Sequence, residues 1–167
     1  MDAAADTEFG EFMSARWPGL VRLGYGLTGD RQAAEDLAQT ALARAYAAWP
    51  RVRRANDPDA YVRRILLNVN HSRHRMRRFT EHLTADPPDQ GAPDPAGARD
   101  DRSALLAALA ALPHGQRAVI VLRYWLDLTE PQAAAALGCS VGNVKSQAAR
   151  GLAKLRLSPE LAEGELR

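Results

Sequence analysis

Apolar residues recur every three or four positions in the first half of the chain, over residues 9–27 and again over residues 31–49. That spacing matches the 3.6-residue turn of an amphipathic helix, so both segments are predicted to be helical. Gly29 and Asp30 separate them, because glycine suits the C-terminal cap of a helix and aspartate suits the N-cap. Pro18 is expected either to begin a new helix or to kink the first one.

A further helix is predicted to start at Asp57 and Pro58, since an N-cap acid followed by proline at the first helical position favours initiation. Pro50 should end the preceding helix and leave a basic loop over residues 51–56. Residues 68–72 read Asn-Val-Asn-His-Ser and are poor helix formers. They predict a break, followed by a last basic turn that ends near Phe79.

The composition changes abruptly over residues 84–97, which hold four prolines, two glycines, three aspartates and no large apolar residue. Such a segment cannot bury a core and is typical of a linker. We therefore divide the chain into a first helical unit at residues 1–80, a linker at residues 81–100 and a second helical unit at residues 101–167.

The second unit carries apolar periodicity and stop signals for four helices and then a tail, with the helices at about residues 101–112, 116–125, 129–137 and 140–157. Thr129 and Ser140 are the expected N-caps of the last two helices, and Gly138 in the turn between them permits a left-handed backbone. Two helices joined in this way indicate a DNA-binding helix-turn-helix. An ordinary helical hairpin shows the same local pattern, so the motif by itself leaves both interpretations open.

The last of these helices has one apolar and one polar stripe. Its apolar stripe is expected to face the core and consists of Val141, Val144, Ala148, Leu152 and Leu155. Its outward stripe consists of Asn143, Ser146, Gln147, Arg150 and Lys154, with Lys145 and Ala149 on the flanks. Asn, Gln, Ser and Arg side chains read base edges or hold phosphates, so the outward stripe is the predicted contact with duplex DNA.

Composition favours an all-α fold of two small helical domains, because the chain is rich in Ala, Leu and Arg, which are strong helix formers. The net charge is only +2, but it is spread unevenly. Residues 50–78 hold nine arginines against two aspartates, and residues 141–157 hold four basic residues and no acid. Residues 81–101, by contrast, hold one arginine against six acids. Two basic patches favour contact with nucleic-acid phosphates over two merely solvated helix faces.

Other chemistry finds little support in the sequence. Cys139 is the single cysteine, so neither an intrachain disulfide nor a cysteine zinc site is expected. His71 and His74 have the spacing of a metal pair, but no nearby carboxylate completes a site and the surrounding arginines repel cations. Glu35 and Asp36 lack a histidine partner for acid–base catalysis. We expect no enzyme activity, no cofactor and no metal, and, without a signal peptide or a spanning segment, a cytoplasmic location.

Two sets of motifs resemble those of RNA polymerase sigma factors. The segment from LPHGQRAV through LRYWLDLTEPQAAAALGCSVGNVKSQAARGLAKL is similar to sigma region 4. GLTGDRQAAEDLAQTALARAYAAW resembles regions 2.1–2.2, and DPDAYVRRILLNVNHSRHRMRR resembles regions 2.3–2.4. With a short linker in place of a folded region 3, the chain resembles the extracytoplasmic-function (ECF) group, and within it the short SigE-like sigma factors.

This resemblance implies that the chain binds core RNA polymerase, at the β′ coiled coil and the β flap, and directs it to promoter DNA. The coiled coil would be gripped by the helix that carries Glu35, Asp36, Gln39, Leu42 and Arg44. In the family, a loop between regions 2.3 and 2.4 captures an unpaired base of the −10 element, and Asn68 stands at the matching position. Further hydrogen bonds would come from Asn70 and His71, and the DNA backbone would be held by Arg63, Arg64, Arg73, Arg75, Arg77 and Arg78.

For the −35 duplex, the resemblance points to the contact positions Lys145, Ser146, Gln147, Ala149 and Arg150. Asn143 stands where the family usually has Thr, which leaves the preferred −35 sequence open. An anti-sigma protein that holds the two units closed is a further partner that the resemblance suggests. The alternative interpretation is a stand-alone helix-turn-helix regulator, whose N-terminal unit serves dimerisation or sensing and which binds its operator without polymerase.

Overall fold

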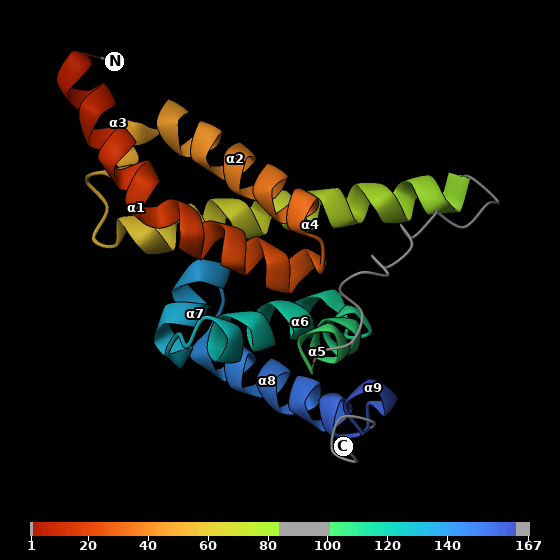
Figure 1. Cartoon of the computed structure of the whole chain (residues 1–167). Coiled ribbons are helices and arrows are strands. Elements are labelled where there is room, and N and C mark those ends of the chain that lie inside the picture. Colours follow the sequence, from red (N-terminus) through yellow and green to blue (C-terminus); the bar gives the residue numbers. More distant parts are fainter. Residues whose placement is uncertain (1, 84–100, 163–167) are drawn as a thin grey trace.

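The structure, a computed structural model, describes residues 2–83 and 101–162, and every element in those ranges is helical (Figure 1). In chain order the elements are α1 (Ala3–Thr28), α2 (Arg31–Ala47), α3 (Trp49–Val52), α4 (Pro58–Leu83), α5 (Asp101–Ala110), α6 (His114–Ile120), the π-helical η1 (Val121–Trp125), α7 (Glu130–Leu137), α8 (Val141–Arg156) and α9 (Pro159–Ala162). The predicted all-α fold is confirmed. The Pro-rich and Asp-rich segment at residues 84–97 lies outside the described residues.

The helix ends of the first unit follow the local sequence signals. Gly29 adopts a φ of 70° at the C-terminal cap of α1. Asp30 and Asp57 then cap α2 and α4, since their carboxylates accept hydrogen bonds from the backbone N–H groups of Ala33 (3.0 Å) and Ala60 (2.9 Å). Each cap satisfies a backbone donor that the first turn of a helix leaves unpaired.

Some helix boundaries differ from the prediction. Of the two alternatives at Pro18, a new helix is excluded because α1 is one helix through this residue, and α4 continues through residues 68–72 without the predicted break. The break is absent because Leu66, Leu67 and Val69 are buried, so tertiary packing outweighs the low helix propensity of their polar neighbours. The proline after Trp49 lies within α3 instead of starting a loop, and the predicted tail begins with α9.

In the first unit, α1, α2 and α4 pack around a shared apolar core. Leu23, Leu37 and Leu66, one from each helix, are almost completely buried. Gly24 allows α1 and α2 to approach closely, because a Cβ at this position would lie 2.9 Å from the Cα of Ala34. Because α1, α2 and α4 bury their apolar faces against one another, the polar faces of α2 and α4 lie on the outside of the unit.

In the second unit, α7 and α8 form the predicted helix-turn-helix. Thr129 closes a capping box at the start of α7, Gly138 takes the left-handed φ of 69° in the turn, and Ser140 caps α8. Gly151 on α8 lies against α6, where a Cβ would come within 2.8 Å of the Cγ1 atom of Ile120. This close approach fixes the inner face of α8 on the unit and leaves its opposite face outward.

The two units pack against each other. In Figure 1 the second unit lies beneath the first, and contacts join α4 to α7 and α1 to both η1 and α5. Buried side chains of both units belong to one continuous apolar cluster. We call the boundary between the two units the seam.

Candidate nucleic-acid and polymerase interfaces

The polar stripe of α8 lies on the surface as predicted. Its side chains are exposed at Asn143, Lys145, Ser146, Ala149, Arg150 and Lys154, whereas Gln147 is half-buried. On the opposite face Val144 and Ala148 are buried, and Leu152 and Leu155 are half-buried. The prediction that Val141 faces the core was wrong, because this first residue of α8 is 36% exposed.

The candidate −10 residues lie along α4. Exposed side chains are those of Arg64, Asn68, His71, Arg73, Arg75, Arg77 and Arg78, while Arg63 and Asn70 are half-buried. Asn68 lies within the continuous helix and not in a loop. Three of the arginines contact other parts of the protein. Arg73 donates a hydrogen bond to the Thr40 hydroxyl (3.0 Å), and Arg63 and Arg64 lie at the seam. The remaining basic side chains make this helix a positively charged ridge.

The candidate polymerase-binding residues lie along α2, and most of them are at least partly exposed. Asp36, Gln39 and Arg44 are exposed, and Glu35 is half-buried and accepts a hydrogen bond from the Nε of Arg31 (3.3 Å). Leu42 does not share this surface. It is only 4% exposed and belongs to the apolar core, so its side chain serves packing and we remove it from the candidate contact set.

Where α1 meets η1, the seam is closed by hydrogen bonds as well as apolar contact. The Arg22 guanidinium donates two hydrogen bonds to the Trp125 carbonyl (3.2 and 3.0 Å), and the Trp125 indole N–H donates to the Arg22 carbonyl (2.8 Å). Arg117 donates to the carbonyl of Gly26 (3.1 Å). Gly26 is itself a close-approach point, since a Cβ there would lie 2.8 Å from the Cγ1 atom of Val121 and 3.2 Å from the Trp125 ring.

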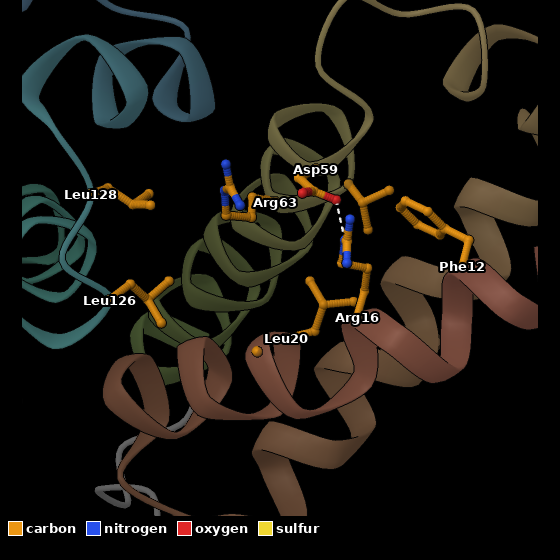
Figure 2. Close-up of a pocket in the computed structure, with 9 residues that line it drawn as sticks. Phe12, Arg16, Leu20, Asp59, Arg63, Leu126 and Leu128 are labelled. Atoms are coloured by element: carbon orange, nitrogen blue, oxygen red, sulfur yellow. Dashed lines mark hydrogen bonds and ion pairs between the residues drawn. The ribbon is translucent and has the colours of Figure 1, made fainter.

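Where α4 meets the second unit, two candidate −10 arginines contact the helix-turn-helix or the loop before it. The Arg64 guanidinium lies over Gly138, so that a Cβ at the glycine would be 2.8 Å from the Nη2 atom of the arginine. Arg63 lines a cleft of about 140 Å³ beside Leu126 and Leu128 (Figure 2). That volume is below the roughly 300 Å³ at which small-molecule pockets begin, so we interpret the cleft as part of the seam.

Three histidines meet across the seam, and we call them the histidine cluster. His114, at the start of α6, stacks on His74 of α4 with ring centroids 4.6 Å apart and planes 17° apart, and it contacts His71 at 5.2 Å. Burial, with the neighbouring histidines and Arg117, lowers the pKa of His114 to about 4. Burial and Arg78 also lower the pKa of His74. Both rings are therefore neutral at pH 7, which allows them to stack.

Residues 2–83 and 101–162 contain no group of three His, Cys, Asp or Glu side chains arranged to hold a metal ion. The same residues also contain no helix that is both long and apolar enough to cross a bilayer.

The residues of the seam were not among those predicted from the sequence. Gly26 and Gly151 stand inside helical patterns, and an isolated glycine within a helix is the available signal for close packing. Arg22, Arg117 and Trp125 carried no comparable signal, because their partners lie on the other unit, about 90 to 100 positions away in the chain.

Comparisons with known proteins match both units. The family model for Sigma-70 region 2 matches residues 14–80, and the model for Sigma-70, region 4 matches residues 102–155. The RNA polymerase sigma-E factor of Streptomyces antibioticus is 40% identical over 89% of this chain and 83% of its own length. The ECF RNA polymerase sigma factor SigL of Mycobacterium tuberculosis is 33% identical over 83% of this chain and 81% of its own length.

Solved structures agree with the sequence relatives. The sigma factor RpoE from Bartonella quintana, in complex with the anti-sigma factor NepR, superposes with a TM-score of 0.75 at 25% identity and covers 93% of this chain and 97% of its own. CnrH, in complex with the cytosolic domain of CnrY, gives a TM-score of 0.64 at 25% identity and covers 91% and 87%. The chain therefore belongs to the sigma-70 family of RNA polymerase sigma factors, in the ECF group, and directs the initiation of transcription.

Proposed function

We propose that α8 reads the −35 element and α4 the −10 element, and that the two helices do so in one promoter complex. The observation that carries this assignment is the pair of outward polar faces, one on each unit. The α8 stripe offers Asn143, Ser146 and Arg150, which suit base edges and phosphates of a duplex. The α4 ridge adds arginines for the backbone and Asn68 for an unpaired base.

While the two units are packed together, α8 and α4 are too close to contact the −35 and −10 elements at the same time. Elements named −10 and −35 lie about 25 base pairs apart, which is roughly 85 Å at 3.4 Å per base pair. A compact chain of 167 residues has a radius of gyration of roughly 15 Å and a diameter of roughly 40 Å. The two units must therefore separate at the seam before they engage the two elements together.

The seam also holds residues that we assign to the −10 element. Arg63 lines the cleft at Leu126, and the guanidinium of Arg64 lies over Gly138. A closed chain therefore withholds part of its own −10 contact surface. We propose that core polymerase, bound through Glu35, Asp36, Gln39 and Arg44 of α2 and through the second unit, holds the units apart. RpoE is solved in complex with the anti-sigma factor NepR, and we propose a partner of that class for this chain.

The test is run-off transcription with purified core polymerase on templates whose −35 or −10 element is scrambled. The wild-type chain should give a specific transcript that falls with either scramble. Arg150→Ala should lower transcription from the intact template and have no added effect on the −35-scrambled one. Arg156→Ala, an exposed basic residue of α8 outside the stripe, is the matched control. An equal defect of Arg150→Ala on both templates would contradict a base contact of Arg150 in the −35 element, and no defect on the intact template would contradict the −35 assignment of this residue.

A further inference from the structure

Histidine side chains from both units converge at one point of the seam. His71 and His74 come from α4, and His114 comes from the start of α6, on the other side of the linker. The parallel stack of His74 and His114 buries ring surface that separation of the units would return to water. The stack is therefore a contact that exists only while the units are packed.

Every nearby charge but one disfavours protonation of this cluster. The charges that act on His74 and His114 come from α4 and α6, and Glu81 is the single acid among them, with Arg77, Arg78 and Arg117 as the cations. His114 also lies at the N-terminus of α6, where the helix dipole is positive. A proton on one ring would place a cation against its stacked neighbour and against these arginines.

We propose that the histidine cluster is a pH-sensitive latch, which holds the two units together when its rings are neutral and releases them when it is protonated. Release would separate His114 from His71 and uncover Arg63 at the seam. Because we assign both His71 and Arg63 to the −10 contact surface, acidification would raise the share of chains competent for promoter binding. The latch rests on the proposed separation of the units at the seam.

The direction of the effect follows from linkage. In the closed chain the pKa of His114 is lowered to about 4, while in the open chain the exposed ring has its ordinary value of 6.5. The open state therefore binds protons more readily, and the contribution of His114 to closure is present above pH 6.5 and is lost as the pH falls toward 4. For these two values the closed-to-open ratio falls about eightfold between pH 7.0 and pH 5.5. His74 adds to the fall, since its pKa is also lowered by closure.

The closed-to-open ratio can be measured by fluorescence resonance energy transfer between two dyes on the full-length chain, in the absence of polymerase. Dyes are placed on Ser14→Cys in α1 and on Leu157→Cys after α8, both exposed positions, in a Cys139→Ser background. The same labels are also placed in a Gly26→Ala chain, whose weakened seam brings the equilibrium into a measurable range. Transfer should fall between pH 7.0 and 5.5, while far-ultraviolet circular dichroism confirms an unchanged helix content.

His114→Gln keeps a polar side chain of similar size but cannot be protonated, so it should lose most of the pH response. The double variant His74→Gln/His114→Gln should lose it entirely. His82→Gln is the matched control, because His82 lies on α4 outside the cluster and should leave the response intact. A pH-independent ratio in both backgrounds, or a response in His114→Gln equal to that of the wild type, would overturn the latch. Run-off transcription at pH 7 is scored separately, so that a failed latch with normal promoter-specific transcription leaves the proposed function standing.

Discussion

Replacing Gly26 by Ala should open the seam without harming either unit. The new Cβ would lie 2.8 Å from the Cγ1 of Val121, a fully buried and stiff β-branched side chain, and 3.2 Å from the Trp125 ring. Overpacking of this kind costs about 1–3 kcal/mol, which corresponds to a fall of roughly 5- to 150-fold in the closed-to-open ratio. Inside the isolated first unit the change should instead stabilise α1 by about 1 kcal/mol, because Ala is a better helix former than Gly.

The assay is the dye-labelled chain described above, with Gly10→Ala as the matched control. Gly10 lies on the same helix, and a Cβ there would meet nothing within 4 Å, so the control gains the same helix propensity without a clash. Gly26→Ala should show lower energy transfer than Gly10→Ala at equal helix content, and tighter binding to core polymerase because less closing energy opposes it. Equal transfer in the two variants would refute the close packing inferred at the seam.

Three further predictions concern the candidate contact surfaces and the second unit. Arg150→Ala should weaken −35 binding by about 1–3 kcal/mol if the side chain contacts a base, and an equal loss on every sequence in a binding titration would show a phosphate contact instead. Asn68→Ala should impair promoter opening more than polymerase binding, and a normal permanganate footprint in that variant would refute the base-capture role. Gly151→Ala should destabilise the second unit by about 1–3 kcal/mol, because its Cβ would lie 2.8 Å from Ile120, and an unchanged denaturation midpoint would contradict this.

The local features of the fold could be predicted because each rests on neighbouring residues. The caps at Asp30, Thr129 and Ser140 are satisfied within three residues of the capping side chain, so the sequence pattern specifies them. The outward stripe of α8 followed from periodicity in the same way. The continuity of α4 could not be predicted from local sequence, because it depends on the burial of Leu66 and Val69 against other helices.

The contacts at the seam could not be predicted either, because they join residues that are far apart in the sequence. Arg22 and Trp125 are separated by 103 positions, and nothing in either segment names the other as a partner. In the sequence, His71 and His74 had the spacing of a candidate metal pair, and His71 was also a candidate −10 contact. The structure adds His114 from the second unit, which stacks on His74 and lies tilted against His71. Burial and the neighbouring arginine lower the pKa of His114, which disfavours a cation at this point.

The sequence predicted the exposure of some candidate contact residues correctly and of others incorrectly. Asn68 and Arg150 are exposed, but Asn68 lies within α4 and not in the loop that the family resemblance implied. The polymerase role of Leu42 came from the resemblance alone, and its burial agrees with the apolar period of α2. Val141, the first residue of the apolar stripe of α8, is the residue that periodicity misplaced.

The central claim is that two promoter readers, packed together in the isolated chain, are drawn apart in the initiation complex. The direct measurement is energy transfer between the dyes at Ser14→Cys and Leu157→Cys as core polymerase and then promoter DNA are added, with run-off transcript measured in the same sample. We predict high transfer in the isolated chain and a large fall in complexes that produce the specific transcript. Transfer that stays high while the specific transcript is made would contradict the account.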